Sequence, residues 1–190
     1  MSLQAEADQL QMLKALEQKK QDQQSRKSQQ EEIIYHQRAT FRVDNELYGI
    51  DVMQVKEVLR YSEITPVPGA DASILGIINL RGNVVTVIDT RQLFRLPPAQ
   101  PDDETRVIVV EFNESEVIGL VVDSVDEVLS LPQSEVDRAP NASGDETSKR
   151  FVQGVCYHNG MLIILLDLSK MLLSITPADD EDIVASSGAL

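Results

Sequence analysis

The hydrophobic and polar positions of this chain follow the same pattern twice. Glycines at 76 and 82 bracket a turn and precede an aliphatic run that ends at Asp89. The same arrangement returns 78 residues later and ends at Asp167, and an earlier stretch, 48–59, matches 118–129. Two copies of about 60 residues are too few for a solenoid, which needs about three repeats. The pattern therefore predicts two similar, fused subdomains.

Short alternating and aliphatic runs predict strands in both copies. Residues 41–50 alternate around Asp44 and Asn45, which suit a hairpin turn. Residues 84–88 and 161–166 are aliphatic with little polar interruption. Such runs are typical of strands covered on both faces, although periodicity alone leaves a short buried helix open.

Turn and cap signals follow at matching places in the two copies. Asn159–Gly160 is a strong hairpin signal because both central residues of the preferred turn need positive φ, and 81–83 form the matching turn of the first copy. Asp89 and Asp167 each precede a short helical pattern, where a carboxylate can accept bonds from free backbone N–H groups. We expect a short helix after each aspartate.

The two copies also serve as controls for each other, because a shared residue indicates the fold and an unshared one indicates function. Arg81 lies in the first turn, whereas the neutral Asn159 holds the matching position in the second. The shared glycines and capping aspartates are assigned to backbone geometry. Cys156 matches Ile78 and is predicted to be a buried strand residue.

Composition divides the 190 residues into three parts. Residues 1–38 hold ten glutamines and balanced charge, and we expect a helical or disordered arm. Residues 39–175 contain the repeat, with a linker near 97–105 and a polar surface insertion at 140–149. Residues 176–190 are acidic and rich in small residues, and we expect a flexible tail.

The formal net charge of −14 excludes some partners. Binding to nucleic acid is disfavoured because phosphate contact requires a basic face. Docking on an anionic membrane surface is disfavoured because such a surface attracts basic segments. The chain contains neither a run of about 18 apolar residues nor a signal-peptide core, so no membrane insertion is expected. A single cysteine indicates a reducing, cytoplasmic location.

Candidate catalytic and metal-binding groups are few. His36, His158 and Cys156 are the only histidines and cysteine, and their spacing matches no zinc site. A nucleophilic pair of Cys156 and His158 would share a strand face but lacks a third, orienting group. We predict no catalytic residue, no metal and no cofactor.

Carboxylates offer an alternative. Asp123, Asp126 and Glu127, with His158, are the raw material for a cation site or an enzyme. An exposed strand or turn is the simpler interpretation of Asp126 and Glu127, because they match Lys56 and Glu57 in the other copy. Residues 102–104 lie in the linker and are interpreted as a solvated loop.

Several motifs together resemble the CheW family of chemotaxis coupling proteins. Residues 79–82 (Asn-Leu-Arg-Gly), preceded by 74–78 and followed by 84–89, carry the resemblance. So do 48–51 with 55–58, and 121–125 leading into 128–131. The resemblance covers about residues 39–175. It implies two five-stranded β-barrel subdomains, intertwined around a shared core, in a mostly β fold.

The resemblance also implies a function. Members of the family are non-enzymatic scaffolds that join the cytoplasmic tips of methyl-accepting chemoreceptors to the regulatory domain of a CheA-type histidine kinase. They alternate with that domain, or with other CheW-like domains, in rings within receptor arrays. The arm of 38 residues exceeds what the family usually carries, and its role is unassigned.

The family's binding surfaces map onto positions of this sequence. The receptor-binding surface falls on five residues: Val55, Glu57, Gly76, Arg81 and Gly154. The kinase-binding surface is expected on exposed apolar side chains of the first barrel, at Tyr48, Ile50 and Met53. A guanidinium such as that of Arg81 can bond receptor carboxylates or carbonyls, and its alternative partner is Glu57 in the same half. A third hypothesis, a purely structural oligomer built on open strand edges, stays open beside the adaptor and the cation site.

Overall fold

The computed structural model describes residues 2–28, 32–138 and 151–175, and it divides into two compact units, Met1–Ile34 and Tyr35–Leu190. The first unit contains α1 (Ser2–Ser28), so the arm is helical over 27 residues. The first strand begins at Tyr35, a few residues before the expected boundary at 39. The predicted insertion at 140–149 and the acidic tail at 176–190 lie outside the described residues.

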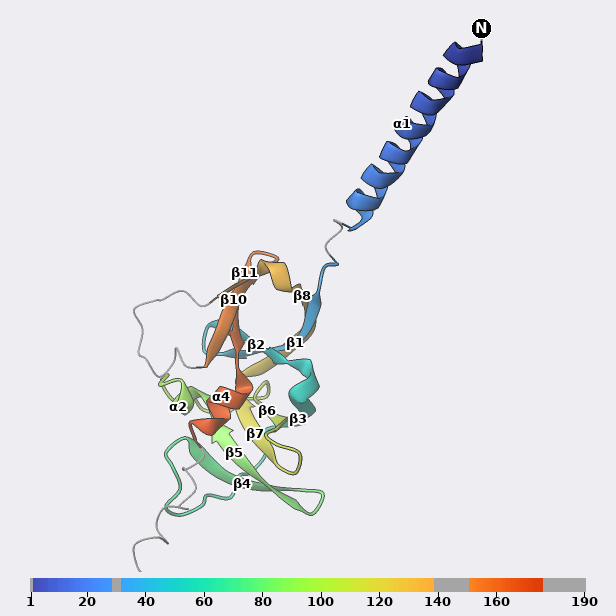
Figure 1. The fold of residues 1–190 in the computed structure, drawn as a ribbon. Coiled ribbons are helices and arrows are strands. Elements are labelled where there is room, and N and C mark those ends of the chain that lie inside the picture. The colour runs from blue at the N-terminus through green and yellow to red at the C-terminus, as the bar shows by residue number, and fades with distance from the viewer. Residues whose placement is uncertain (1, 29–31, 139–150, 176–190) are drawn as a thin grey trace, which may run out of the picture. The chain divides into compact units, whose positions relative to one another are not determined.

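The second unit is mostly β, as the repeat predicts, and its strands form two sheets (Figure 1). The first sheet has the order β8 (Ser124–Pro132), β1 (Tyr35–Val43), β2 (Glu46–Asp51), β11 (Met161–Leu166), β10 (Val152–His158) and β9 (Val136–Arg138). The second sheet has the order β3 (Val55–Arg60), β6 (Arg106–Glu111), β7 (Val117–Val122), β5 (Asn83–Asp89) and β4 (Ile74–Leu80). The described part of this unit also contains four short helices: η1 (Val52–Gln54), α2 (Thr90–Leu93), η2 (Gln133–Glu135) and α4 (Leu168–Leu173).

The two sequence copies exchange strands between the sheets. The β1–β2 hairpin of the first copy lies between β8 and β11 of the second, and the β6–β7 hairpin of the second copy lies between β3 and β5 of the first. β11 runs parallel to β2, and β5 runs parallel to β7. The first sheet therefore takes two strands from the first copy and four from the second, and the second sheet takes three and two, so the repeat units cannot separate without breaking both sheets.

Each sheet also closes on itself into a barrel. In the second sheet the chain just after β3 bridges to β4, where the amide of Thr65 donates to the carbonyl of Ile77 at 3.0 Å and the Ile77 amide donates back at 2.9 Å. In the first sheet the chain after β8 continues through η2 into β9, which pairs with β10. Closure leaves fewer free strand edges, which are a common site of unwanted pairing.

One hydrophobic core joins the barrels, as the resemblance implies. Phe41 and Ile50 from the first sheet pack in the same cluster as Ile108 and Leu120 from the second, together with Met171 of α4. A smaller cluster contains the buried Cys156 and residues of β2, β8 and β11. Burial raises the pKa of the Cys156 thiol, and the nearby charges of Glu135 and Asp137 raise it further, so this cysteine is confirmed as a core residue with a suppressed thiolate.

The paired aspartates cap helices, which confirms the prediction made from the repeat. Asp89 accepts hydrogen bonds from the amides of Arg91 and Gln92 at the start of α2. Asp167 accepts one from the amide of Lys170 in α4. Both carboxylates thus satisfy backbone donors that the first turn of a helix leaves free.

Candidate functional site

The two β-hairpin turns that differ between the copies have the same backbone geometry. Arg81 and Gly82 have φ values of 52° and 85°, and Asn159 and Gly160 have values of 50° and 77°. Positive φ at both central residues fits the preferred two-residue hairpin turn. In this conformation the Cβ of any L-residue approaches the carbonyl oxygen, and asparagine offsets the cost with local hydrogen bonds from its short polar side chain, which arginine does not do. Arg81 therefore occupies a position that disfavours it.

The Arg81 side chain reaches across the opening of its barrel. Its Nη2 donates to Oε1 of Glu57 at 2.7 Å. Glu57 lies on β3 and Arg81 follows β4, and these strands stand at opposite ends of the strand order of their sheet. The ion pair therefore ties together the two edges of the sheet. The Arg81 side chain keeps 74% of its surface exposed, against 28% for Glu57, so most of the arginine side chain faces solvent.

The second barrel keeps the acid but lacks the base. Glu127 on β8 matches Glu57, and Asn159 matches Arg81. Glu127 is exposed, and the neutral Asn159 side chain cannot form a salt bridge with it. The two barrels thus share strands, turns and caps but differ in this exposed cation.

The sequence-predicted receptor residues are partly brought together. Val55 and Glu57 lie on β3, half-buried and two residues apart, and Arg81 reaches this strand. Gly76 lies on β4 in the same sheet, whereas Gly154 lies on β10 in the other. Both glycines are buried, so neither presents a side-chain surface.

A close approach of the backbone explains both glycines. A Cβ on Gly76 would lie 2.0 Å from the carbonyl oxygen of Thr65, and the residue has φ of 150°. A Cβ on Gly154 would lie 2.6 Å from the carbonyl oxygen of Asp137. Each glycine sits at a register shift in its hairpin, where the barrel closes. Both glycines therefore allow the backbones at the barrel edges to approach closely enough to pair.

The expected kinase-binding residues divide differently, and two of them correct the prediction. Ile50 has no exposed surface and Tyr48 only 9%. Burial, with the nearby charges of Glu46 and Asp44, raises the pKa of Tyr48 to about 12. Tyr48 and Ile50 belong to the shared core because β2 is covered on both faces, so they are not exposed apolar side chains. Met53 is 80% exposed and remains available for binding.

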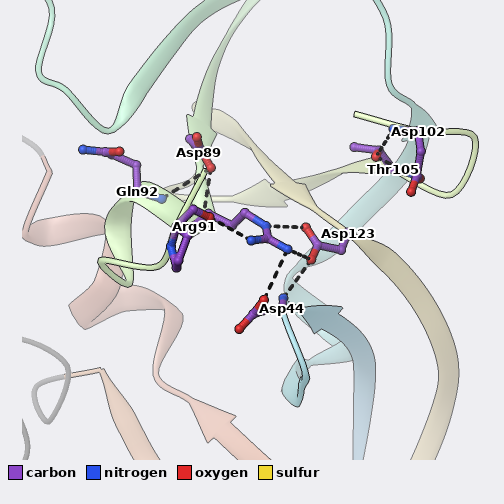
Figure 2. A network of polar contacts seen from close by, with 8 residues as sticks. Asp44, Asp89, Arg91, Gln92, Asp102, Thr105 and Asp123 are labelled. Atoms are coloured by element: carbon purple, nitrogen blue, oxygen red, sulfur yellow. Dashed lines mark hydrogen bonds and ion pairs between the residues drawn. The ribbon is translucent and has the colours of Figure 1, made fainter. Parts of the chain in front are cut away.

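A second asymmetric feature is the network around Arg91 (Figure 2). Arg91 Nε and Nη2 donate to the two carboxylate oxygens of Asp123, at 2.9 and 2.5 Å. Asp123 also accepts the backbone amide of Asp44 at 2.7 Å, and Arg91 Nη1 donates to the carbonyl of Pro97 at 2.8 Å. The network joins the α2 start, the β1–β2 turn, the end of β7 and the linker between the copies.

Electrostatics of this network stabilise the charged forms. Burial alone would raise the pKa of Asp123, but the hydrogen bonds from Arg91 and from the Asp44 amide, with the positive charge of Arg91, hold that pKa below its usual range. The Arg91 side chain is 15% exposed. The matching residues of the other copy are Met53 for Asp123 and Ser169 for Arg91, so no such pair forms there. Arg91, like Arg81, is therefore a cation that only the first copy carries, and this difference between the copies is the sequence signal that identifies it.

The proposed cation ligands serve other partners. Asp123 is held by Arg91, and Asp126 pairs with Arg42 at 3.4 Å. Within residues 2–28, 32–138 and 151–175, no three His, Cys, Asp or Glu side chains converge as metal ligands would. The concavity beside the Arg91 network encloses about 170 Å³, less than the about 300–1,000 Å³ of usual ligand pockets.

A family model described as "CheW-like domain" matches residues 37–176. The chain belongs to the CheW family. The chemotaxis protein CheW of Bacillus subtilis (strain 168) is 38% identical over 125 residues, which cover 66% of this chain and 80% of that protein. The corresponding protein of Klebsiella aerogenes is 35% identical over 134 residues, 70% of this chain and 80% of that protein.

A solved structure has the same fold. The scaffolding protein CheW from Thermoanaerobacter tengcongensis superimposes with a TM-score of 0.66 at 31% identity, covering 73% of this chain and 92% of that one. The chain is therefore a chemotaxis coupling protein of the scaffold type. The match begins at residue 37, so α1 and the few residues that follow it lie outside the matched CheW-like domain. None of the helices in the described segments is both long and apolar enough to cross a membrane.

Proposed function

We propose that this CheW-family chain is a non-enzymatic adaptor of the cytoplasm. It joins the cytoplasmic tips of methyl-accepting chemoreceptors to the regulatory domain of a CheA-type histidine kinase, in arrays beneath the inner membrane. Family membership supports the class of function, and the exposed, unshared Arg81 carries the assignment of the receptor site.

Arg81 is the receptor-binding cation. Glu57 accepts one hydrogen bond from Nη2, while 74% of the side chain remains exposed. A guanidinium has five donors in a rigid fork, so it holds Glu57 and still offers donors to a carboxylate or carbonyl of the receptor. Val55 lies two residues before Glu57 on β3, across a register shift, and packs against the shared core, so it anchors the strand that carries Glu57.

Gly76 and Gly154 support the receptor site indirectly. Gly76 allows the chain after β3 to bridge to β4, which places Glu57 within reach of the turn that carries Arg81. Gly154 does the same for the second barrel. Substitution at either position therefore acts on the receptor site through barrel closure.

The kinase-binding surface centres on Met53 in η1. Tyr48 and Ile50 act on this surface indirectly. Their burial in the shared core fixes β2, and the end of β2 leads directly into η1. An exposed methionine is a flexible apolar contact that adapts to a partner surface.

A charge exchange separates direct contact by Arg81 from mere ordering of the site. Arg81→Glu alone removes the cation and places two acids together, so both hypotheses predict weaker receptor binding. The double variant Glu57→Arg/Arg81→Glu restores an ion pair between the same two strands. Direct contact predicts that the double variant still binds the receptor tip weakly, whereas a purely ordering role predicts recovery.

The measurement is titration of a receptor cytoplasmic fragment, with kinase activation as a second readout. Loss of a charge-assisted hydrogen bond, about 1.5–3 kcal/mol, corresponds to affinity reduced by roughly 10- to 150-fold. Circular dichroism and thermal unfolding verify that each variant is folded. Wild-type receptor affinity and kinase activation in Arg81→Glu would contradict the assignment.

A further inference from the structure

The helix α1 (Ser2–Ser28) lies outside the CheW-like domain and forms a compact unit of its own. At 1.5 Å rise per residue it is about 40 Å long. Every side chain from residue 5 to residue 25 is exposed, and the apolar Leu10, Leu13 and Leu16 each expose more than half of their surface. Most helices in proteins gain their stability by packing an apolar face. We therefore expect the face formed by Leu10, Leu13 and Leu16 to pack against a partner.

The position of charges relative to Leu13 indicates what kind of partner fits. Glu6, Leu13 and Lys20 are spaced by seven residues, and seven residues drift by only about 20° around a helix. The three side chains therefore form one line along the helix. Leu10 and Leu16 flank this line, three residues on either side of Leu13.

The charge of the helix is divided along its length. Residues 2–12 contain two acids, Glu6 and Asp8, and no base. Residues 14–28 contain five bases and two acids. Two such helices side by side in the same direction place like charges opposite each other, whereas an antiparallel pair places each acidic half against a basic half.

We propose that α1 pairs in an antiparallel manner with α1 of a second copy of this chain, centred on Leu13. In this register Leu13 meets the partner's Leu13, and Glu6 lies level with the partner's Lys20. Leu10 lies level with the partner's Leu16. By symmetry each dimer contains two Glu6–Lys20 pairs.

The proposed association is weak. The apolar face spans about two heptads, shorter than the 3–4 heptads typical of a stable coiled coil. Exposed ion pairs add little each. Pairing is therefore concentration-dependent, and it is favoured where many copies are held close together, because tethering raises the effective concentration.

Charge exchange in the full-length chain tests both the pairing and its direction. Sedimentation equilibrium over micromolar to millimolar concentrations gives the dimer dissociation constant. Glu6→Lys and Lys20→Glu each replace two attractive pairs by two repulsive ones, and weaken the dimer by about five- to tenfold. The double variant Glu6→Lys/Lys20→Glu restores the wild-type constant. Leu13→Lys abolishes association.

Asp22→Lys is the matched control, because Asp22 lies nine residues from Leu13 and so on the opposite face of the helix. It makes the same charge change as Glu6→Lys and leaves dimerisation nearly unchanged. A monomer at all concentrations would overturn the proposal, as would an Asp22→Lys effect equal to that of Glu6→Lys. Failure of the double variant to recover would overturn the antiparallel register. None of these outcomes bears on receptor binding by Arg81.

Discussion

The hairpin turns of the two barrels are the same structure built with different residues. The turn after β4 uses Arg81 with Gly82, and the turn after β10 uses Asn159 with Gly160, at nearly equal φ values. Asparagine suits the left-handed region, whereas other L-residues pay about 1–2 kcal/mol there. The Arg81–Glu57 ion pair offsets only part of this conformational cost, since exposed ion pairs contribute about 0.2–1 kcal/mol. The first barrel therefore gives up stability to hold a cation at its edge, which is the pattern expected of a functional site.

The closing glycines provide the largest expected difference from a single substitution. In Gly76→Ala the new Cβ would meet the Thr65 carbonyl oxygen at 2.0 Å, at a φ of 150°. We expect a loss of about 3–4 kcal/mol in unfolding free energy. Gly154→Ala meets the Asp137 carbonyl at 2.6 Å without the positive φ, and we expect a smaller loss. Urea unfolding checks both, and equal losses would show that the barrels close in energetically equivalent ways.

The Arg91 network is the next largest effect. Arg91→Ala leaves the Asp123 carboxylate without its bidentate partner, and we expect a loss of about 2 kcal/mol in unfolding free energy. Ser169→Ala changes the matching residue of the second copy, which is exposed, and stays within about 0.5 kcal/mol of wild type. Similar losses in the two variants would contradict the asymmetry between the copies, of which Figure 2 shows the Arg91 side.

The pKa of Asp123 predicts how this difference depends on pH. The folded state lowers that pKa below its unfolded value, near 3.9 for a free aspartate. The ionised carboxylate therefore stabilises the fold fully above about pH 5, and the contribution disappears as pH falls through the lowered folded pKa. Comparing wild type with Asp123→Asn by urea unfolding from pH 7 to pH 3, we expect the gap in stability to shrink toward the acid end. A gap that stays constant down to pH 3 contradicts the assignment.

The smallest expected effect comes from moving the cation to the second barrel. Asn159→Arg places a guanidinium in the turn opposite Glu127, at the cost of an arginine with positive φ. We expect a net loss of about 0.5–1 kcal/mol in unfolding free energy. A double-mutant cycle with Glu127→Gln isolates the new ion pair, and a coupling energy near zero would show that the second barrel does not bring these positions together.

Local features of the fold were predictable because the repeat states them twice. The hairpin turns at 81–83 and 159–160, the caps at Asp89 and Asp167 and the buried Cys156 follow from pattern and turn chemistry. The exchange of strands was not readable from the residues, since β11 pairs with β2 across more than 100 residues. Such pairing leaves no local signal, and the intertwined arrangement came from the family resemblance.

The site was predictable to the extent that it is asymmetric. Comparing the copies singled out Arg81, and the structure places Glu57, its alternative partner, in contact with it. The burial of Tyr48 and Ile50 was not predictable from this comparison. A strand covered on both faces lacks the alternation of apolar and polar residues that marks an exposed face. Arg91 and Asp123 are likewise unshared between the copies, so the same asymmetry marks them in the sequence, but their pairing across 32 residues is visible only in the structure.

Arg81→Asn tests the central claim most directly, because it gives the first turn the residue that the second turn already uses. Thermal unfolding and titration with a receptor cytoplasmic fragment are measured on the same preparation. We predict stability equal to or slightly above that of wild type, since relief of the strained turn offsets loss of the Glu57 ion pair. Receptor affinity falls by roughly 10- to 150-fold. Wild-type affinity in this variant, or a loss of stability large enough to account for the loss of binding, would contradict the account.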